Sequence, residues 1–169
     1  QVIAAAMALK AGWDIDRIRA RLTQIRENTD VTYTLDTLDY LARGGRIGRV
    51  QALAGSLLNI KPIITVEKAD GKYSTLSRGR TINQAINNIA THFADIYGSE
   101  KPVWVTVMHG QFAEKADLLA EAIKTKLNVA HLELRRISPV LGVHTGPGIV
   151  GAGVLPMELV SDLGELPTL

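Results

Sequence analysis

The sequence predicts an α/β domain whose sheet is mixed. Segments with helical and strand periodicity alternate along most of its 169 residues, as expected when helices pack on a sheet. Two short runs, 63–67 and 72–76, flank Asp70-Gly71, a pair typical of tight hairpin turns. Because a hairpin joins antiparallel strands, we expect a mixed, largely antiparallel sheet with packed helices rather than a purely parallel one.

The start of the chain is predicted to be helical. Residues 1–11 form a first helix that ends at Gly12, and Asp14 caps a second helix whose apolar residues recur at helical spacing. A short β-branched strand is then expected over 31–35.

The next segment is expected to contain two helices joined by a turn. Asp36 is predicted to cap the first of them, and Gly44 to end it in the left-handed conformation that costs glycine no strain. The second begins near Val50 and stops before Pro62, since the residue before a proline disfavours helix.

After the hairpin, helices and strands alternate. Helical spacing of isoleucines predicts a helix over 82–96, and a second apolar stripe predicts one over 116–127. Strands are expected over 103–108, 129–137 and 149–155.

These elements divide the chain into three parts. We assign residues 1–30 to helices of another body, 31–157 to the mixed-sheet domain and 158–169 to a C-terminal tail without periodicity. The chain opens at Gln1 inside a helical pattern, which we interpret as the boundary of a fragment.

Composition limits the class of protein. Hydrophobic residues make up 46% and charged residues 21%, close to the average of soluble globular domains, while a net charge of +2 does not indicate nucleic-acid binding. The chain has no cysteine, which suits a reducing compartment, and no apolar run reaches the roughly 20 residues of a membrane helix. We therefore expect a cytoplasmic protein with neither a nucleic-acid partner nor membrane insertion.

The segment RGGRIGR, residues 43–49, could bind an anion. Glycines let backbone N–H groups approach an anion, and arginine offers two parallel hydrogen bonds to a carboxylate or phosphate. For so short a pattern, a helix C-cap followed by a turn with solvated arginines is the more common explanation.

The segment HTGPG, residues 144–148, places an imidazole and a hydroxyl on flexible backbone beside the sheet. Taken alone, this segment is better explained as an ordinary turn with an exposed histidine than as a binding site. The sequence offers no nucleophile beside a base and no histidine pair with metal spacing. We therefore expect neither an enzyme nor a cofactor or metal.

Together with a third segment, these motifs resemble the DegV family of bacterial fatty-acid-binding proteins. LDTLDYLARGGRIGR (35–49), LAGSLLNIKPIIT (53–65) and GVHTGPG (142–148) occur in the family's order. The resemblance implies a Rossmann-like N-terminal domain and an α/β C-terminal domain that enclose one fatty acid. It also implies that, in Gram-positive bacteria, the acid is presented to a fatty acid kinase, which phosphorylates its carboxyl group for phospholipid synthesis.

The resemblance further implies that residues 1–30 are residual helices of the Rossmann-like N-terminal domain. Most of that domain, with its carboxylate-binding threonine and serine, then lies outside this truncated chain. The matching motifs place Arg46 and His144 near the carboxylate of the ligand. By inference from their apolar face, the residues expected to wall the acyl tunnel are Leu53, Leu57, Leu58, Ile60 and Ile63.

Simple energetics agrees with this division of roles. Burial of about 15 methylenes gains ~12 kcal/mol, against an association cost of roughly 4–15 kcal/mol, so the tunnel provides affinity and the polar end provides orientation. An enzyme or regulator that binds a phosphorylated small molecule through the Gly-Arg turn stays open as the alternative. Nucleic-acid binding ranks last, because the turn lacks stacking aromatics.

Overall fold

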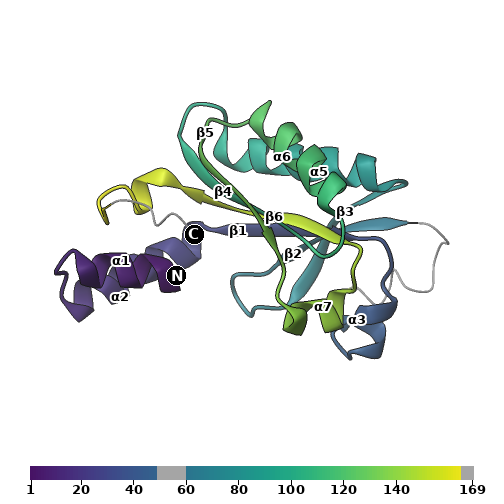
Figure 1. The fold of residues 1–169 in the computed structure, drawn as a ribbon, viewed down its shortest axis with the longest axis horizontal. Helices are drawn as coiled ribbons and strands as arrows, with labels where there is room; N and C mark the ends of the chain where they lie inside the picture. The colour runs from purple at the N-terminus through teal and green to yellow at the C-terminus, as the bar shows by residue number, and fades with distance from the viewer. Residues whose placement is uncertain (49–59, 165–169) are drawn as a thin grey trace.

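The structure, a computed structural model, describes residues 1–48 and 60–164. In this part of the chain, six strands form a sheet of order β3-β2-β1-β6-β4-β5 (Figure 1). Neighbouring strands are antiparallel except β4 and β5, which are parallel, so the predicted mixed and largely antiparallel sheet is confirmed. The strands are β1 (Asp30–Leu35), β2 (Lys61–Val66), β3 (Tyr73–Gly79), β4 (Val103–His109), β5 (Val129–Arg136) and β6 (Ile149–Pro156).

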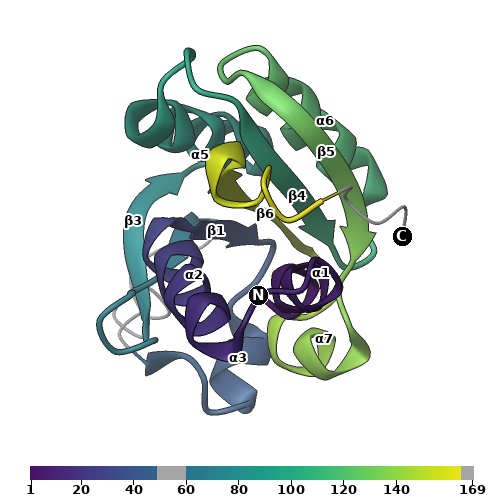
Figure 2. The ribbon, with the colours of Figure 1, turned by 90° about the vertical axis from the view of Figure 1, so that its left-hand side faces the viewer.

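The helices cover the two faces of this sheet unequally. Helices α5 and α6 lie along one face, whereas α3 and α7 lie beneath one end of the other face and α1 and α2 lie near its opposite end (Figure 1, Figure 2). The helices are α1 (Val2–Lys10), α2 (Ile15–Asn28), α3 (Asp39–Arg43), α5 (Ile82–Tyr97), α6 (Ala113–Lys124) and α7 (Pro139–Thr145), and a 3-10 turn, η2, follows at Met157–Leu159.

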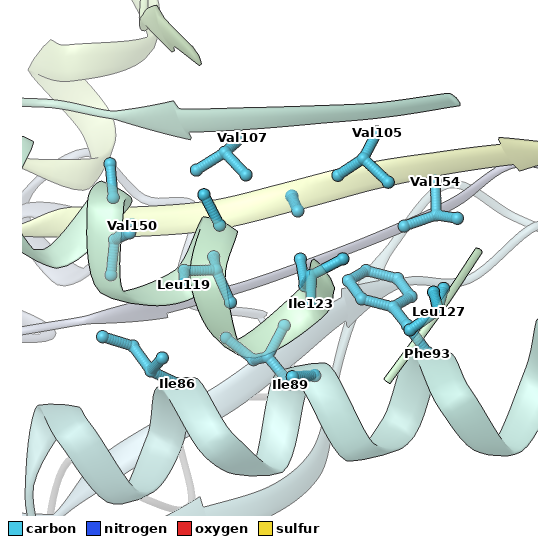
Figure 3. Packing of buried hydrophobic residues seen from close by; sticks show 14 of the residues in the cluster. Ile86, Ile89, Phe93, Val105, Val107, Leu119, Ile123, Leu127, Val150 and Val154 are labelled. Carbon is cyan, nitrogen blue, oxygen red and sulfur yellow. The ribbon is translucent and has the colours of Figure 1, made fainter. Parts of the chain in front are cut away.

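The main core lies between the sheet and the α5–α6 pair, and Figure 3 shows its packing. Side chains alternate between the faces of a strand, so every second residue of β4 and β6 points toward these helices. The side chains on this covered face include Val103, Val105, Val107, Val150, Ala152 and Val154, all fully buried. They pack against helix residues that include Ile86, Ile89, Phe93, Leu119 and Ile123.

A second cluster holds α1 and α2 to the C-terminal segment. Val160 and Leu163 are buried among apolar residues of both helices. Arg21 on α2 donates to the two carboxylate oxygens of Asp162 at 2.5 and 2.9 Å, and to the Leu159 carbonyl at 2.9 Å. The hydrogen bonds from Arg21 hold the pKa of Asp162 below its ordinary value. The first residues of the expected tail are therefore packed against α2.

The predicted helix cap at Asp36 is wrong. The backbone N–H of Asp36 donates to the Gly148 carbonyl at 2.9 Å, which continues the alignment of β1 with β6, and its carboxylate accepts from Lys61 at 2.6 Å. Because these contacts keep Asp36 in line with the strand, α3 begins only at Asp39, after Leu38 as an N-cap that makes no side-chain cap bond.

Helix α3 ends before Gly44, as predicted, but the predicted left-handed conformation of Gly44 is wrong. Gly44 keeps a right-handed conformation with φ −79°, and Gly45 adopts the left-handed one with φ +65°. The helix expected from Val50 lies outside the described residues.

Tyr97, near the end of α5, connects three elements. Its hydroxyl lies 2.8 Å from the Asp30 carboxylate, 3.0 Å from the Asn28 carbonyl and 2.9 Å from the Val154 carbonyl. Lys68 also reaches Asp30, at 2.9 Å. Burial, and then the hydrogen bond to Asp30, raises the pKa of Tyr97 well above its ordinary value. This contact links the end of α2 to the sheet.

We predict that Tyr97→Phe lowers the free energy of unfolding by about 1–3 kcal/mol at neutral pH, because buried acceptors lose their donor. The raised pKa of Tyr97 means that its contribution is complete below the unfolded tyrosine pKa of about 10 and declines as pH rises above it. In urea denaturation between pH 7 and 11, the free energy of unfolding should therefore fall less at alkaline pH in the variant than in the wild type. Tyr40→Phe, on a ring that is 37% exposed, is the matched control. Equal stability of wild type and Tyr97→Phe across this pH range would show that the Tyr97 hydroxyl does not stabilise the fold.

Candidate functional site

The face of the sheet opposite α5 and α6 contains an apolar trough. Two adjoining hollows of about 490 and 130 Å³ lie over this face and share Val31 and Val66 as lining residues. The first is bordered by α1 and the end of α2, and the second by α7. We call the two hollows together the trough. Apolar side chains that line it include Ile3, Ile25, Leu155 and Val160 at one end and Met108, Ile137, Leu141 and Ile149 at the other.

The floor of the trough is formed by a strand that carries little side chain. On β6, Gly151 pairs with Tyr33 and Met108, and Gly153 pairs with Val31 and Thr106, so these residues share one face. A Cβ placed on Gly151 would collide with Tyr33, whereas a Cβ on Gly153 would meet only Val31, at 3.8 Å, and the Asp30 carbonyl, at 4.0 Å. Space therefore lies open above Gly153.

Helices α3 and α7 meet closely at the other end of this face. A Cβ on Gly44 would lie 2.7 Å from Nδ1 of His144, and a Cβ on Gly146 would collide with the ring of Tyr40. Only glycine leaves room for these rings, so the glycines of both motifs allow the two helices to approach. The segments RGGRIGR and HTGPG, which are 98 residues apart from Arg46 to His144, are thus neighbours in space.

Arg46 and His144 both contact Gly44. The Arg46 guanidinium donates through Nη1 to the Gly44 carbonyl at 2.9 Å, and the residue is exposed. A guanidinium carries five N–H donors, so others remain for an anion. Nδ1 of His144 is buried and has no hydrogen-bond partner among the described residues. This corner therefore combines a fixed cation with an unpaired imidazole nitrogen.

The expectation that His144 lies in a turn is wrong. It belongs to α7, which Ser138 caps by accepting from the Leu141 N–H at 3.3 Å and which has Pro139 in its first turn. A serine followed by proline is a signal for the start of a helix, so this helix could have been predicted from the sequence.

The expected wall residues divide into three groups. Leu53, Leu57 and Leu58 lie outside the described residues, and Ile60 is half-buried just before β2. The prediction that Ile63 walls the tunnel is wrong, because Ile63 is 1% exposed and packs with the α5–α6 core on the covered face. The next residue, Ile64, belongs to the cluster of Tyr33 and Leu41 on the trough side.

A further side chain of the trough bears a donor that lacks a partner. Trp104 Nε1 is buried and unbonded within the described part of the chain, whereas the buried hydroxyl of Tyr33 has Tyr73 as its neighbour. Burial, and then the neighbouring Tyr73, raises the pKa of Tyr33 well above its ordinary value. Tyr33, Trp104 and Gly153 were not predicted from the sequence, although glycine at alternate positions of an apolar strand is a signal of close approach by other groups.

Residues 1–48 and 60–164 contain neither a metal-binding cluster nor a membrane-spanning helix. No cluster of three histidine, aspartate or glutamate side chains there could hold a metal ion. None of the described helices is both long and apolar enough to cross a membrane.

Comparison with known sequences agrees with the motifs. The family model described as "Uncharacterised protein, DegV family" matches residues 1–157. A DegV domain-containing protein of Clostridium perfringens is 37% identical over 153 residues, which are 90% of this chain and 54% of that protein. The chain spans about half the length of the relatives that it matches.

Solved structures share the fold. A DegV family protein from Thermus thermophilus, described for its fatty acid binding, has a TM-score of 0.82 and 29% identity over 90% of this chain and 54% of its own. A fatty acid binding DegV family protein from Streptococcus agalactiae has a TM-score of 0.80 and 25% identity, over 90% of this chain and 53% of its own. With a family match over residues 1–157, the chain belongs to the DegV family.

Proposed function

We propose that this chain forms the C-terminal part of a fatty-acid-binding protein. In this proposal, a long-chain fatty acid lies along the trough, with its carboxylate toward Arg46 and His144. The observation that carries the proposal is an apolar trough over Gly153 on the same sheet face as a corner that holds a cation and an unpaired imidazole. The fatty acid binding described for the relatives from Thermus thermophilus and Streptococcus agalactiae supports the choice of ligand.

The dimensions of the trough fit a long chain. Strand β1 runs beneath it, and the five residue steps from Asp30 to Leu35 span about 17 Å at roughly 3.4 Å per residue. An extended hydrocarbon advances about 1.3 Å per carbon–carbon bond, so this length accommodates about 13 bonds. Medium-chain acids would leave part of the apolar floor uncovered, which favours long-chain acids.

The two ends of the site have different tasks. Each methylene removed from water contributes about 0.8 kcal/mol, so the trough supplies most of the affinity. The exposed Arg46 contributes less, since solvent screens its charge, but its planar fork matches the two oxygens of a carboxylate. The headgroup thus fixes the direction in which the ligand lies.

The exposed position of Arg46 also suggests how the ligand is used. We propose that the protein is a cytoplasmic carrier rather than an enzyme, and that it presents the carboxyl group to a fatty acid kinase for phospholipid synthesis. The part of the DegV relatives that this chain does not match would close the trough from the other side. Support comes from the accessible carboxylate corner and from the resemblance of the motifs.

We predict that Gly153→Val, made in the full gene product, weakens binding of hexadecanoic acid at least tenfold. Valine suits a strand, and the space above Gly153 admits its Cβ without collision, so the side chain should fill the trough while the fold persists. Calorimetric titration measures the affinity, and thermal unfolding checks the fold. Ala130→Val, at an exposed position of edge strand β5, is the control. Unchanged affinity in Gly153→Val would show that the ligand lies elsewhere.

We also predict that Arg46→Ala weakens binding of hexadecanoic acid about tenfold, because a charge-assisted hydrogen bond is lost. Binding of hexadecanol should change little, since an alcohol has no charge to pair with Arg46. Arg43→Ala, which removes a neighbouring exposed arginine, is the matched control. An equal loss for acid and alcohol would contradict the role of Arg46. A phosphate-dependent thermal shift that requires Arg46, without fatty acid binding, would instead support the phosphorylated-ligand alternative.

A further inference from the structure

Gly44, the residue that follows α3, contacts both side chains that are expected at the carboxylate. Its carbonyl accepts a hydrogen bond from Nη1 of Arg46 at 2.9 Å. A Cβ on Gly44 would lie 2.7 Å from Nδ1 and 3.6 Å from Cε1 of His144, so this edge of the imidazole faces Gly44. The same residue therefore holds the guanidinium through its carbonyl and makes room for the imidazole through its missing side chain.

The backbone of Gly44 does not itself require glycine. Its φ of −79° and ψ of 0° are right-handed and open to any residue, whereas the left-handed conformation falls on Gly45. Alanine in such a conformation would restrict the unfolded chain and so favour the folded state. A Cβ there would also meet the Tyr40 carbonyl oxygen at 3.1 Å, a milder contact than the one with Nδ1. The closest constraint on this position is thus the ring of His144.

The contact with Gly44 decides which nitrogen of His144 can serve a ligand. A neutral imidazole carries its one hydrogen on either Nδ1 or Nε2. Nδ1 is buried and has no hydrogen-bond partner among the described residues. A hydrogen on Nδ1 would therefore be buried without an acceptor, which costs free energy, whereas a bare lone pair there can face the C–H groups of Gly44. The hydrogen of the neutral ring is thus expected on Nε2, which is not on the ring edge that faces Gly44.

We propose that Gly44 is a positioning residue for the ligand carboxylate. It fixes the ring of His144 so that Nε2–H faces the ligand, and it holds the guanidinium of Arg46 beside that ring. A carboxylate accepts from both groups, and the bond from Arg46 is charge-assisted. This inference rests on the proposed function, because it requires the carboxylate to lie at this corner. It gives residue 44 a part in selecting the headgroup, in addition to its part in the packing of α3 against α7.

Calorimetric titration of the full gene product with hexadecanoic acid and hexadecanol tests this role. Gly44→Ala should weaken binding of the acid about tenfold, because its methyl group displaces the ring of His144 and the carboxylate loses a hydrogen bond. Binding of the alcohol should change by less than about twofold, since the trough supplies most of its affinity. Gly142→Ala, on α7, is the matched control: its Cβ would meet only Ile137 Cδ1, at an ordinary 3.7 Å, so both affinities should equal those of the wild type.

A double variant separates displacement of the ring from a general disturbance of the corner. Gly44→Ala combined with His144→Ala keeps the new methyl group and its contact with the Tyr40 carbonyl, but it has no ring to displace. It should therefore bind hexadecanoic acid as weakly as His144→Ala alone. Losses that add up in the double variant would overturn the inference, because Gly44 would then act on another part of the site. An equal loss for acid and alcohol in Gly44→Ala would overturn it as well.

The ligand-free wild type offers a second measurement, which stays decisive even if Gly44→Ala does not fold. Nitrogen-15 NMR of the histidine rings at alkaline pH, where imidazoles are neutral, distinguishes the protonated nitrogen from the bare one. The spectrum of His144→Ala identifies the signals of His144. We expect the hydrogen on Nε2, and a hydrogen on Nδ1 would overturn the inference while fatty acid binding stands. If the wild type binds no fatty acid, the proposed function itself fails, whichever nitrogen carries the hydrogen.

Discussion

The structure depends on the unequal faces of strand β6. One face carries Val150, Ala152 and Val154, which are fully buried under α5 and α6. The other carries Gly151, against which Tyr33 packs, and Gly153, above which the space is open. Because side chains alternate along a strand, one sequence of eight residues both anchors the core and forms the floor of the trough.

The elements at the two ends of the trough are held by polar contacts and close packing. At one end, Tyr97 links the end of α2 to β1 and β6, and Arg21 links α2 to the C-terminal segment through Asp162. At the other end, glycine motifs let α3 and α7 meet around the ring of His144. A rigid sheet with fixed ends suits binding of an extended ligand, because little order must be created when the ligand enters.

Much of this fold could be predicted from the sequence. The Asp70-Gly71 turn indicated the hairpin, and apolar spacing located α5, α6 and the strands, because these elements are long and strongly periodic. The helix cap predicted at Asp36 was wrong, because its carboxylate accepts a hydrogen bond from Lys61 instead. The tunnel position predicted for Ile63 was also wrong, since a periodic pattern does not say which face of a sheet the helices cover. The motifs indicated Arg46 and His144. The alternate glycines of β6 signal close approach by other groups, but which residues lie beside Gly153 depends on strand pairing across distant segments, which a local pattern does not contain.

The proposed function requires the acyl chain to lie along the trough and to point in one direction. A crystal structure of the full gene product with a fatty acid brominated at its terminal carbon would locate that carbon by anomalous scattering. We expect the bromine at the end of the trough near Trp104 and Leu155, with the carboxylate beside Arg46 and His144. A bromine beside α3 and α7, or bound away from the open face of the sheet, would contradict it.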